Sequence, residues 1–275
     1  MNHADTRALV ALALQEDIGS GDLTTAACVG PDREAIGRYY ARQDCVVAGV
    51  ELLEYIYDLR GGVKHLHLFA TSGKQVVDGQ MIAEIRGSAR TLLECERVSL
   101  NFIQRLSGVA TIARKYADAV AHTKCRVLDT RKTTPGMRRL EKFAAHSGGV
   151  VNHRMGLYDA VLIKNNHITA AGGVTAALDR VRHLTCHIEI EVRTLAELDE
   201  ALSCGAKHLL LDNLTPSEAA AWIRRIDGRA STELSGNITL ETIRAYAESG
   251  ADFVSSGAIT HSAPSVDFNF RIELY

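Results

Sequence analysis

The chain has 275 residues, of which 46% are hydrophobic and 23% charged, as in folded globular proteins rather than disordered or fibrous ones. Its net charge of −2 argues against a general nucleic-acid or membrane-surface binder, and no apolar run approaches the roughly 18 residues of a membrane span. The six cysteines form no C-x-x-C pair, so we expect reduced core residues in a cytoplasmic protein.

The first part of the chain has a mixed α/β pattern. Ala8–Leu14 is apolar and flanked by acidic residues, which predicts an amphipathic helix rather than a secretory signal. Strand-like runs follow at Gly37–Ala41, Cys45–Val50, Lys64–Phe69 and Val76–Gly87, the last with a turn at Asp78-Gly79. From Leu92 the apolar spacing is helical up to Gly108, where we place a domain boundary.

The rest of the chain alternates short apolar runs with helical segments. The runs are Arg126–Leu128, Ala160–Ile163, Ile188–Val192, His208–Leu211, Thr232–Leu234 and Phe253–Ser255. This alternation predicts a parallel sheet, and polar residues follow nearly every run. Because the carboxyl ends of all strands converge on one face of a (β/α) barrel, a barrel explains this pattern better than an open sheet with one switch point.

Basic residues are concentrated between Asp129 and His167, where seven lysines and arginines stand against three acidic residues. Arg131, Lys132, Arg154 and Lys164 lie at or beside predicted strand ends, where a barrel mouth would enclose them. Cations in a cleft need an anionic partner to offset their repulsion and desolvation, and arginine pairs well with carboxylate or phosphate. The pattern predicts an anionic small substrate; a solvated basic face is the alternative.

Two Ser-Gly turns, Ser235-Gly236-Asn237 and Ser256-Gly257-Ala258, follow the last two predicted strands. We expect Thr239 to cap a helix over Leu240–Glu248 after the first turn. A glycine turn that opens a helix presents free N–H groups, and the last loops of barrels often bind phosphate. The two turns therefore predict a phosphate site, with ordinary turns as the alternative.

Glu191 and Asp212 end neighbouring predicted strands, so we expect their carboxylates to lie side by side. Such a pair suits ribose hydroxyls or a hard cation such as magnesium. A barrel-interior acid paired with a lysine is the alternative. Glu189 lies two residues deeper on the same face, and we expect it to matter less.

Blocks along nearly the whole chain resemble one known family. They are Glu16–Asp22, Glu96-Arg97, Leu100–Phe102, Leu106–Thr111, Asp129–Gly136, Gly148–Leu157, Lys164–His167 and Gly257–Ser262. In these blocks the chain resembles the quinolinate phosphoribosyltransferases. The most specific parts of the resemblance are the T-R-K-T-x-P-G and N-H-R-x-G-L blocks. The resemblance implies transfer of phosphoribosyl from phosphoribosyl pyrophosphate to quinolinate with decarboxylation, in NAD biosynthesis.

The resemblance also implies a domain plan: an N-terminal α/β sandwich over residues 1–108, to which the tail 264–275 returns, and an incomplete (β/α) barrel over 109–263. It implies a homodimer, or a higher oligomer, in which Arg97 reaches the active site of the neighbouring subunit. The implied partners are the two small substrates, with no nucleic acid and no membrane.

Residue roles follow from the same resemblance. Facing the pyridine dicarboxylate would be Thr130, Arg131, Lys132, His153, Arg154 and Lys164. Glu191 and Asp212 would face the ribose and its Mg²⁺, held directly or indirectly. The turns that would hold the 5′-phosphate contain Ser235, Gly236, Asn237, Ser256, Gly257 and Ala258. The implied catalytic residues are Lys132, Lys164, Glu191 and Asp212.

The sequence departs from the family pattern at three positions. Asn165 replaces an aspartate, Asn237 a glycine of the phosphate turn, and Val150 a glycine. Three alternative functions stay open: a molybdenum-operon paralogue of the same fold, a Schiff-base lyase that uses Lys164, and a non-enzymatic ligand sensor. The paralogue typically lacks the lysine that Lys164 supplies here.

Overall fold

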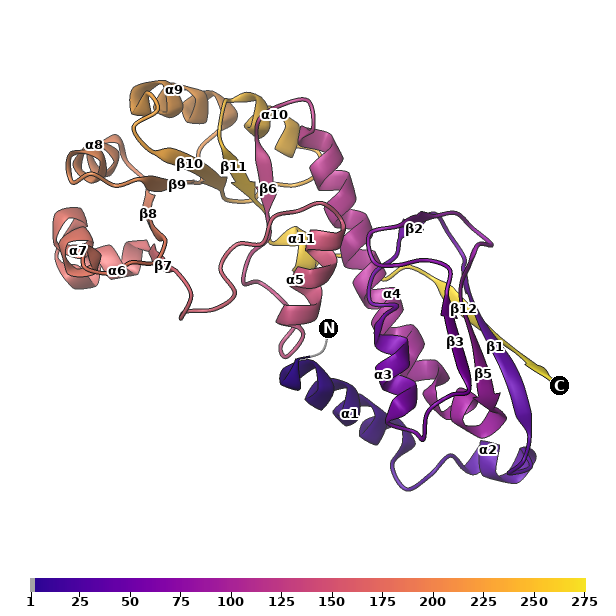
Figure 1. Cartoon of the computed structure of the whole chain (residues 1–275). Coiled ribbons are helices and arrows are strands. Elements are labelled where there is room, and N and C mark those ends of the chain that lie inside the picture. The colour runs from indigo at the N-terminus through magenta and orange to yellow at the C-terminus, as the bar shows by residue number, and fades with distance from the viewer. Residues whose placement is uncertain (1–2) are drawn as a thin grey trace. The chain divides into compact units, whose positions relative to one another are not determined.

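The structure is a computed structural model that describes residues 3–275. The chain forms two compact units (Figure 1). The first unit comprises the residues up to Arg114, Thr134–Gly149 and Ser262–Tyr275, and the second comprises Lys115–Thr133 and Val150–His261.

An antiparallel sheet with the strand order β12-β1-β5-β3 forms one layer of the first unit. Its strands are β1 Glu34–Ala41, β3 His65–Leu68, β5 Met81–Ser88 and β12 Phe268–Leu274, and a separate pair is β2 Cys45–Val46 with β4 Gln75–Val76. Alternate residues of β1 are buried, as a half-buried strand requires. The last strand of the chain, β12, pairs with β1 in this sheet.

Helices α3 Leu52–Asp58 and the first part of α4 Ala89–Val120 form the other layer of this sandwich (Figure 1). The other helices of the unit are α1 Ala4–Ile18, which contacts α3, α2 Leu23–Cys28 and α5 Arg138–Ser147. The hydroxyl of Tyr39 on β1 is hydrogen-bonded to Tyr57 of α3 at 2.7 Å and to Ser99 of α4 at 2.6 Å. These three buried groups satisfy one another between sheet and helices.

The long helix α4 corrects the helix end expected at Gly108, because the helix continues through this glycine to Val120. A Cβ atom on Gly108 would collide with the backbone carbonyl oxygen of Pro264. The glycine therefore permits a close approach of the C-terminal segment and does not end the helix.

The described residues of the second unit form a six-stranded parallel sheet in the order β6-β11-β10-β9-β8-β7. The bounds are β6 Arg126–Leu128, β7 Val161–Ile163, β8 Ile188–Val192, β9 His208–Asp212, β10 Ser231–Ser235 and β11 Phe253–Ser255. Strands β6 and β7 follow one another in the chain but lie at opposite edges of this sheet, so the barrel is open between them. This arrangement confirms the predicted (β/α) class and its incomplete closure.

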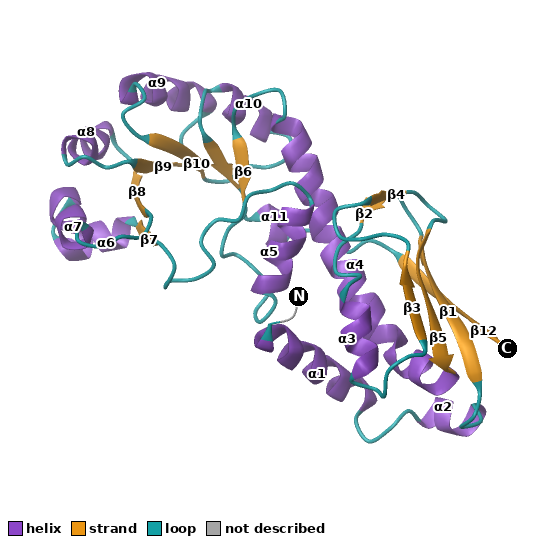
Figure 2. Cartoon of the chain, in the orientation of Figure 1, coloured by secondary structure: helices purple, strands orange, loops and turns teal. Residues whose placement is uncertain are grey.

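Helices follow the strands of this unit and flank the sheet (Figure 2). They are α6 Asn165–Ala171, α7 Val174–Val181, α8 Leu195–Ser203, α9 Pro216–Ile226, α10 Ile243–Glu248 and α11 Ala258–His261. The expectation for α10 was wrong at its start: the helix begins at Ile243, after a turn from Thr239, and Thr242 is its cap residue. The turn at Gly236 therefore does not lead directly into a helix.

The cysteines only partly match the expected core positions. Cys45, Cys95 and Cys125 are buried, whereas Cys28 and Cys186 are exposed and Cys204 is partly exposed; all six thiols are free. Within residues 3–275, no helix combines the length and hydrophobicity that crossing a membrane requires.

Glu141 offers a test of what holds the first unit together. Its buried carboxylate accepts hydrogen bonds from the guanidinium of Arg105 at 2.6 and 3.0 Å and from the hydroxyl of Thr134 at 2.7 Å. Glu141→Ala should lower the free energy of unfolding by roughly 3–5 kcal/mol, because it leaves a mostly buried charge without its partner. Urea denaturation measures this loss. Glu94→Ala, which breaks the more exposed pair with Arg60, is the control. An equal loss of stability in both variants would contradict the larger stabilising role that we assign to the buried Arg105–Glu141 pair.

Candidate active site

A cavity of about 690 Å³ opens in the second unit at the carboxyl ends of its strands. It is lined by Thr130, Arg131, Lys132, His153, Arg154, Leu162, Lys164, Glu191, Leu210, Asp212, Asn213, Glu233, Ser235, Gly236, Asn237, Ile238, Thr239, Ser255, Ser256, Gly257, Ala258 and His261. The structure thus brings together all the site residues predicted from this unit. Arg97, the remaining predicted residue, lies on α4 in the first unit.

Cations dominate one part of the cavity wall. Arg131 and Lys132 follow β6, Arg154 lies on the loop before β7, and Lys164 follows β7. Burial, and then the positive charge of Arg131, lower the pKa of Arg154. Its Nη1 donates a hydrogen bond to the carbonyl of Ala160 at 3.1 Å, which fixes the guanidinium at the wall. The cluster can therefore bind an anion with more than one negative group.

Lys164 forms an ion pair with Glu191 across neighbouring strands. The distance from Nζ to Oε2 is 2.7 Å, and the Glu191 side chain is only 7% exposed. Because β7 and β8 are paired in parallel, both side chains reach the cavity from the same end of the sheet. The carboxylate offsets part of the repulsion among the cations.

Asp212 ends β9, the strand that lies between β8, which carries Glu191, and β10, which carries Ser235. Its Oδ1 accepts a hydrogen bond from the hydroxyl of Ser235 at 2.7 Å, and its Oδ2 accepts one from the Asn213 amide at 2.6 Å. With Glu191 it provides the carboxylate oxygens that Mg²⁺ prefers, and Mg²⁺ commonly needs one or two such protein ligands beside substrate phosphates. The donor set therefore fits this ion.

The two Ser-Gly turns form another part of the wall. Gly236 has φ +106°, and a Cβ there would collide with the side chain of Asn213, so both space and conformation require glycine. Asn237 has φ +49°, a left-handed conformation that asparagine tolerates better than most residues. The backbone at this position, where the family pattern has glycine, can therefore keep its conformation with asparagine.

Gly257 makes room for Lys132. A Cβ on Gly257 would lie 2.7 Å from Cδ of Lys132 and 3.0 Å from Cδ2 of His261. The buried hydroxyl of Thr260 donates a hydrogen bond to the carbonyl of Lys132 at 2.8 Å, which fixes the lysine backbone beside the turn. The side chain of Lys132 therefore passes directly over a glycine.

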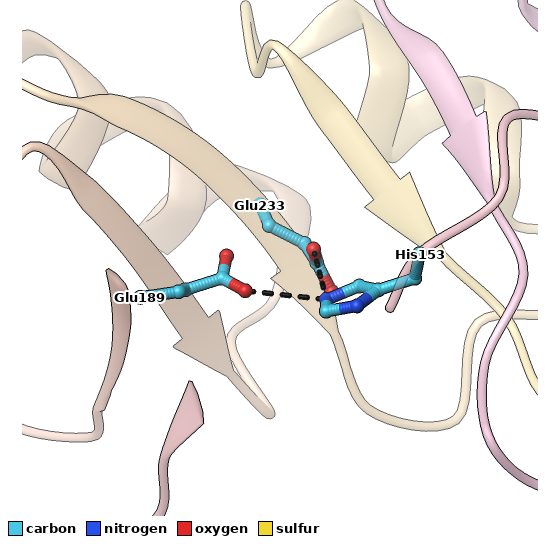
Figure 3. A group of neighbouring side chains, drawn as sticks. All are labelled: His153, Glu189 and Glu233. Carbon is cyan, nitrogen blue, oxygen red and sulfur yellow. Dashed lines mark hydrogen bonds and ion pairs between the residues drawn. The ribbon is translucent and has the colours of Figure 1, made fainter. Parts of the chain in front are cut away.

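His153 contacts two buried carboxylates, Glu189 and Glu233 (Figure 3). Its Nε2 lies 3.2 Å from Oε2 of Glu189 and 3.3 Å from Oε2 of Glu233. Burial alone would lower the pKa of His153, but the hydrogen bonds to the two carboxylates raise it to about 9. The hydrogen bond that Nδ1 accepts from the Arg154 N–H acts against this rise, because only the neutral ring can accept it. Burial also raises the pKa of Glu189, against the hydrogen bond from His153. Among the described residues, these three side chains bring their ligand atoms within 4.8 Å of one another, as a shared metal ion would need.

Glu233 lines the cavity and was missed from the sequence; Glu189, expected to lie deeper than Glu191, is not among the lining residues and contacts His153. Glu233 lies two residues before Ser235 on β10, and Glu189 lies two residues before Glu191 on β8, so both share a face with a predicted site residue. Alternation along a strand could have identified them. Asn213 and His261 also line the cavity without having been predicted. Asn213 directly follows Asp212, and His261 lies within the Gly257–Ser262 block.

Comparison with known proteins finds one family over nearly the whole chain. Residues 22–107 match the N-terminal domain of quinolinate phosphoribosyl transferase and residues 109–271 match its C-terminal domain. A probable nicotinate-nucleotide pyrophosphorylase [carboxylating] of Bacillus subtilis is 37% identical over 100% of this chain and 96% of its own. A quinolinate phosphoribosyltransferase [decarboxylating] of Nicotiana tabacum, 1b, is 38% identical over 98% of this chain and 83% of its own.

Solved structures give the same result. The crystal structure of NadC from Streptococcus pyogenes superposes with a TM-score of 0.94 at 36% identity, covering 100% of this chain and 99% of that chain. A nicotinate-nucleotide pyrophosphorylase from Francisella tularensis superposes with a TM-score of 0.92 at 34% identity, covering 98% of this chain and 96% of that chain.

Gly257→Ala tests the close approach between Lys132 and the turn. The added methyl displaces the lysine, so the dissociation constant for pyrophosphate should rise roughly tenfold or more, because a charge-assisted hydrogen bond contributes about 1.5–3 kcal/mol. Titration calorimetry measures it. Gly30→Ala is the matched control, since its Cβ would meet only Cγ of Arg33 at 3.7 Å. Unchanged affinity in a folded Gly257→Ala protein would remove Lys132 from the anion site.

Proposed function

The chain belongs to the quinolinate phosphoribosyltransferase family, and on that premise we propose how the residues of its cavity divide the work of the family reaction. The reaction transfers phosphoribosyl from phosphoribosyl pyrophosphate to quinolinate and yields nicotinate mononucleotide, pyrophosphate and carbon dioxide, a step of NAD biosynthesis. The observation that carries the assignment of roles is the cation-lined cavity at the carboxyl ends of the barrel strands. Both substrates are polyanions, and the cavity matches them in charge.

Arg131, Arg154 and Lys164 bind the two carboxylates of quinolinate, with Thr130 and His153 beside them. The guanidinium groups suit bidentate carboxylate contacts. Lys164 is held by Glu191 at 2.7 Å and exchanges this partner for a substrate carboxylate. The exchange frees a Glu191 oxygen for the ribose hydroxyls, so that binding of the pyridine ring prepares the neighbouring subsite.

The phosphoribosyl group occupies the rest of the cavity. Its 5′-phosphate accepts hydrogen bonds from the two turns, Ser235–Asn237 and Ser256–Ala258, whose glycines permit close approach of the phosphate to the backbone. Lys132, which lies over Gly257, reaches the pyrophosphate. Glu191 and Asp212 orient the ribose hydroxyls.

Magnesium is the metal that we propose for this site, held by Glu191 and Asp212 directly or through water. Both offer carboxylate oxygens to the same cavity. When bound, Mg²⁺ would neutralise charge on the pyrophosphate oxygens. The chain's own contribution is the pair of carboxylates and the cation of Lys132.

The chemistry requires positioning and charge rather than a side-chain nucleophile. The ring nitrogen of quinolinate forms a bond to C1 of the ribose as the bond from C1 to the pyrophosphate oxygen breaks, through an oxocarbenium-like transition state. Glu191 and Asp212 stabilise the positive ribose, and Lys132 stabilises the departing anion. The adjacent carboxylate then leaves as carbon dioxide, and the electron pair left on the ring carbon beside the cationic nitrogen takes up a proton.

The homodimer with shared sites is a further part of the proposal, as is a cytoplasmic location, which the six free thiols support. In this arrangement Arg97 from one subunit completes the dicarboxylate subsite of the other. Release of pyrophosphate and carbon dioxide in equal amounts from quinolinate, phosphoribosyl pyrophosphate and Mg²⁺ tests the function. Absence of both products would overturn it.

Nicotinate should be a poor substrate, because it lacks the carboxylate that one group of cations binds. Each lost charge-assisted contact costs about 1.5–3 kcal/mol, so kcat/KM should fall by at least roughly tenfold relative to quinolinate. Steady-state pyrophosphate release measures both values. Comparable kcat/KM for the two compounds would contradict the assignment of Arg131, Arg154 and Lys164.

Complementation tests whether Arg97 acts in the site of the other subunit. Arg97→Ala and Lys164→Ala homodimers should each be nearly inactive. After the two are unfolded and refolded together, half of the dimers are mixed, and each contains one intact and one doubly altered site. Activity should therefore recover to roughly one quarter of wild type. Mass-tagged chains verify the exchange, and confirmed exchange without recovery would place Arg97 outside the neighbouring subunit's site.

A further inference from the structure

Two buried acids of the barrel have no role in the function proposed above. Glu189 of β8 and Glu233 of β10 are each 3% exposed. Their strands lie on either side of β9, and both carboxylates reach the same atom, Nε2 of His153 (Figure 3). A buried carboxylate needs hydrogen-bond donors, and here two carboxylates share one ring N–H. The histidine ring is therefore clamped between two strands of the sheet.

The backbone around His153 is fixed as well. The N–H of His153 donates a hydrogen bond to Oδ1 of buried Asp129 at 2.8 Å. The other ring nitrogen, Nδ1, accepts the backbone N–H of Arg154 at 2.7 Å. Because residues 152–160 form a loop, these side-chain contacts take the place of the hydrogen bonds that a helix or strand would supply.

Arg154 is the residue that this clamp positions. Its amide is held by the His153 ring, and its guanidinium lines the cavity while donating to the carbonyl of Ala160. Arginine binds a carboxylate well only when the planar guanidinium has the correct orientation. A ring that could rotate would release the Arg154 amide and with it this orientation.

We propose that Glu189 and Glu233 are positioning residues that clamp the His153 ring and thereby aim Arg154 at a carboxylate of the pyridine substrate. The proposal rests on the proposed function and deepens it, because it names two residues that control selectivity for the dicarboxylate. Nδ1 can accept the Arg154 N–H only in the neutral ring, whose hydrogen lies on Nε2 and faces both carboxylates. The clamp is thus a matter of the reach of the two carboxylates to this one N–H.

Two conservative substitutions at Glu233 separate reach from charge. Glu233→Gln keeps the length of the side chain and an oxygen acceptor but removes the charge. Glu233→Asp keeps the charge but withdraws the oxygens by one methylene from Nε2. We expect the Gln variant to stay within about threefold of the wild-type KM for quinolinate, and the Asp variant to raise this KM roughly tenfold, with the KM for phosphoribosyl pyrophosphate unchanged.

A matched control comes from the surface of the same unit. There, Glu248 bonds Nε2 of His122 at 2.9 Å, so Glu248→Asp alters a Glu–His pair that the cavity does not use. It should leave both KM values unchanged. A double-mutant cycle completes the test: in an Arg154→Met background, Glu233→Asp should add no further increase in the KM for quinolinate, since the positioned group is already absent.

The outcomes separate this inference from the function on which it rests. Wild-type protein that releases neither pyrophosphate nor carbon dioxide would overturn both. Active wild-type protein with the reverse pattern, an impaired Gln variant and a normal Asp variant, would overturn the clamp alone, as would an effect of Glu233→Asp that persists undiminished in the Arg154→Met background. If Glu233→Asp does not fold, Glu189→Asp and Glu189→Gln make the same comparison at the other carboxylate, with the same expected and contradicting results.

Discussion

Repulsion among the cations of one cavity is the constraint on which the rest of the site depends. Arg131, Lys132, Arg154 and Lys164 line the same cavity, and burial, followed by the neighbouring charge of Arg131, lowers the pKa of Arg154. The fold offsets part of this repulsion with a carboxylate on the adjacent strand, Glu191, at 2.7 Å from Lys164. The remaining imbalance is what an anionic substrate relieves, so the same charges that strain the site provide its affinity.

Strand geometry decides which carboxylates face the substrate and which support the site from below. Side chains two residues apart on a strand share a face, so β8 contributes Glu191 at the cavity and Glu189 beneath it. β10 repeats the arrangement with Ser235 above Glu233. In the proposed function the upper positions meet ligand, and the lower ones contact His153. One face of a short parallel sheet thus supplies both the binding groups and the residues that orient them.

Much of the strand arrangement could be predicted from the sequence: Arg126–Leu128, Ile188–Val192 and Phe253–Ser255 were predicted as strands at their observed bounds. Prediction failed where a long-range contact decides the local structure. Gly108 was interpreted as a helix end, but it accommodates Pro264 inside a continuing helix. The spacing of Glu233 from Ser235 could have placed it on the cavity face, but its contact with His153 could not be predicted, because the two residues are distant in sequence and only the folded unit brings them together. Naming quinolinate required the family resemblance, because charge and spacing predict an anion but not which one.

A crystal structure of the protein with quinolinate and a non-reacting analogue of phosphoribosyl pyrophosphate would show directly how the cation cluster is used. We expect the pyridine dicarboxylate to contact Arg131, Arg154 and Lys164, and Lys164 to have left Glu191 for a substrate carboxylate. The phosphate should lie on the Gly236 and Gly257 turns. A dicarboxylate bound elsewhere, with the Lys164–Glu191 pair intact and the cation cluster without ligand contacts, would contradict this expectation.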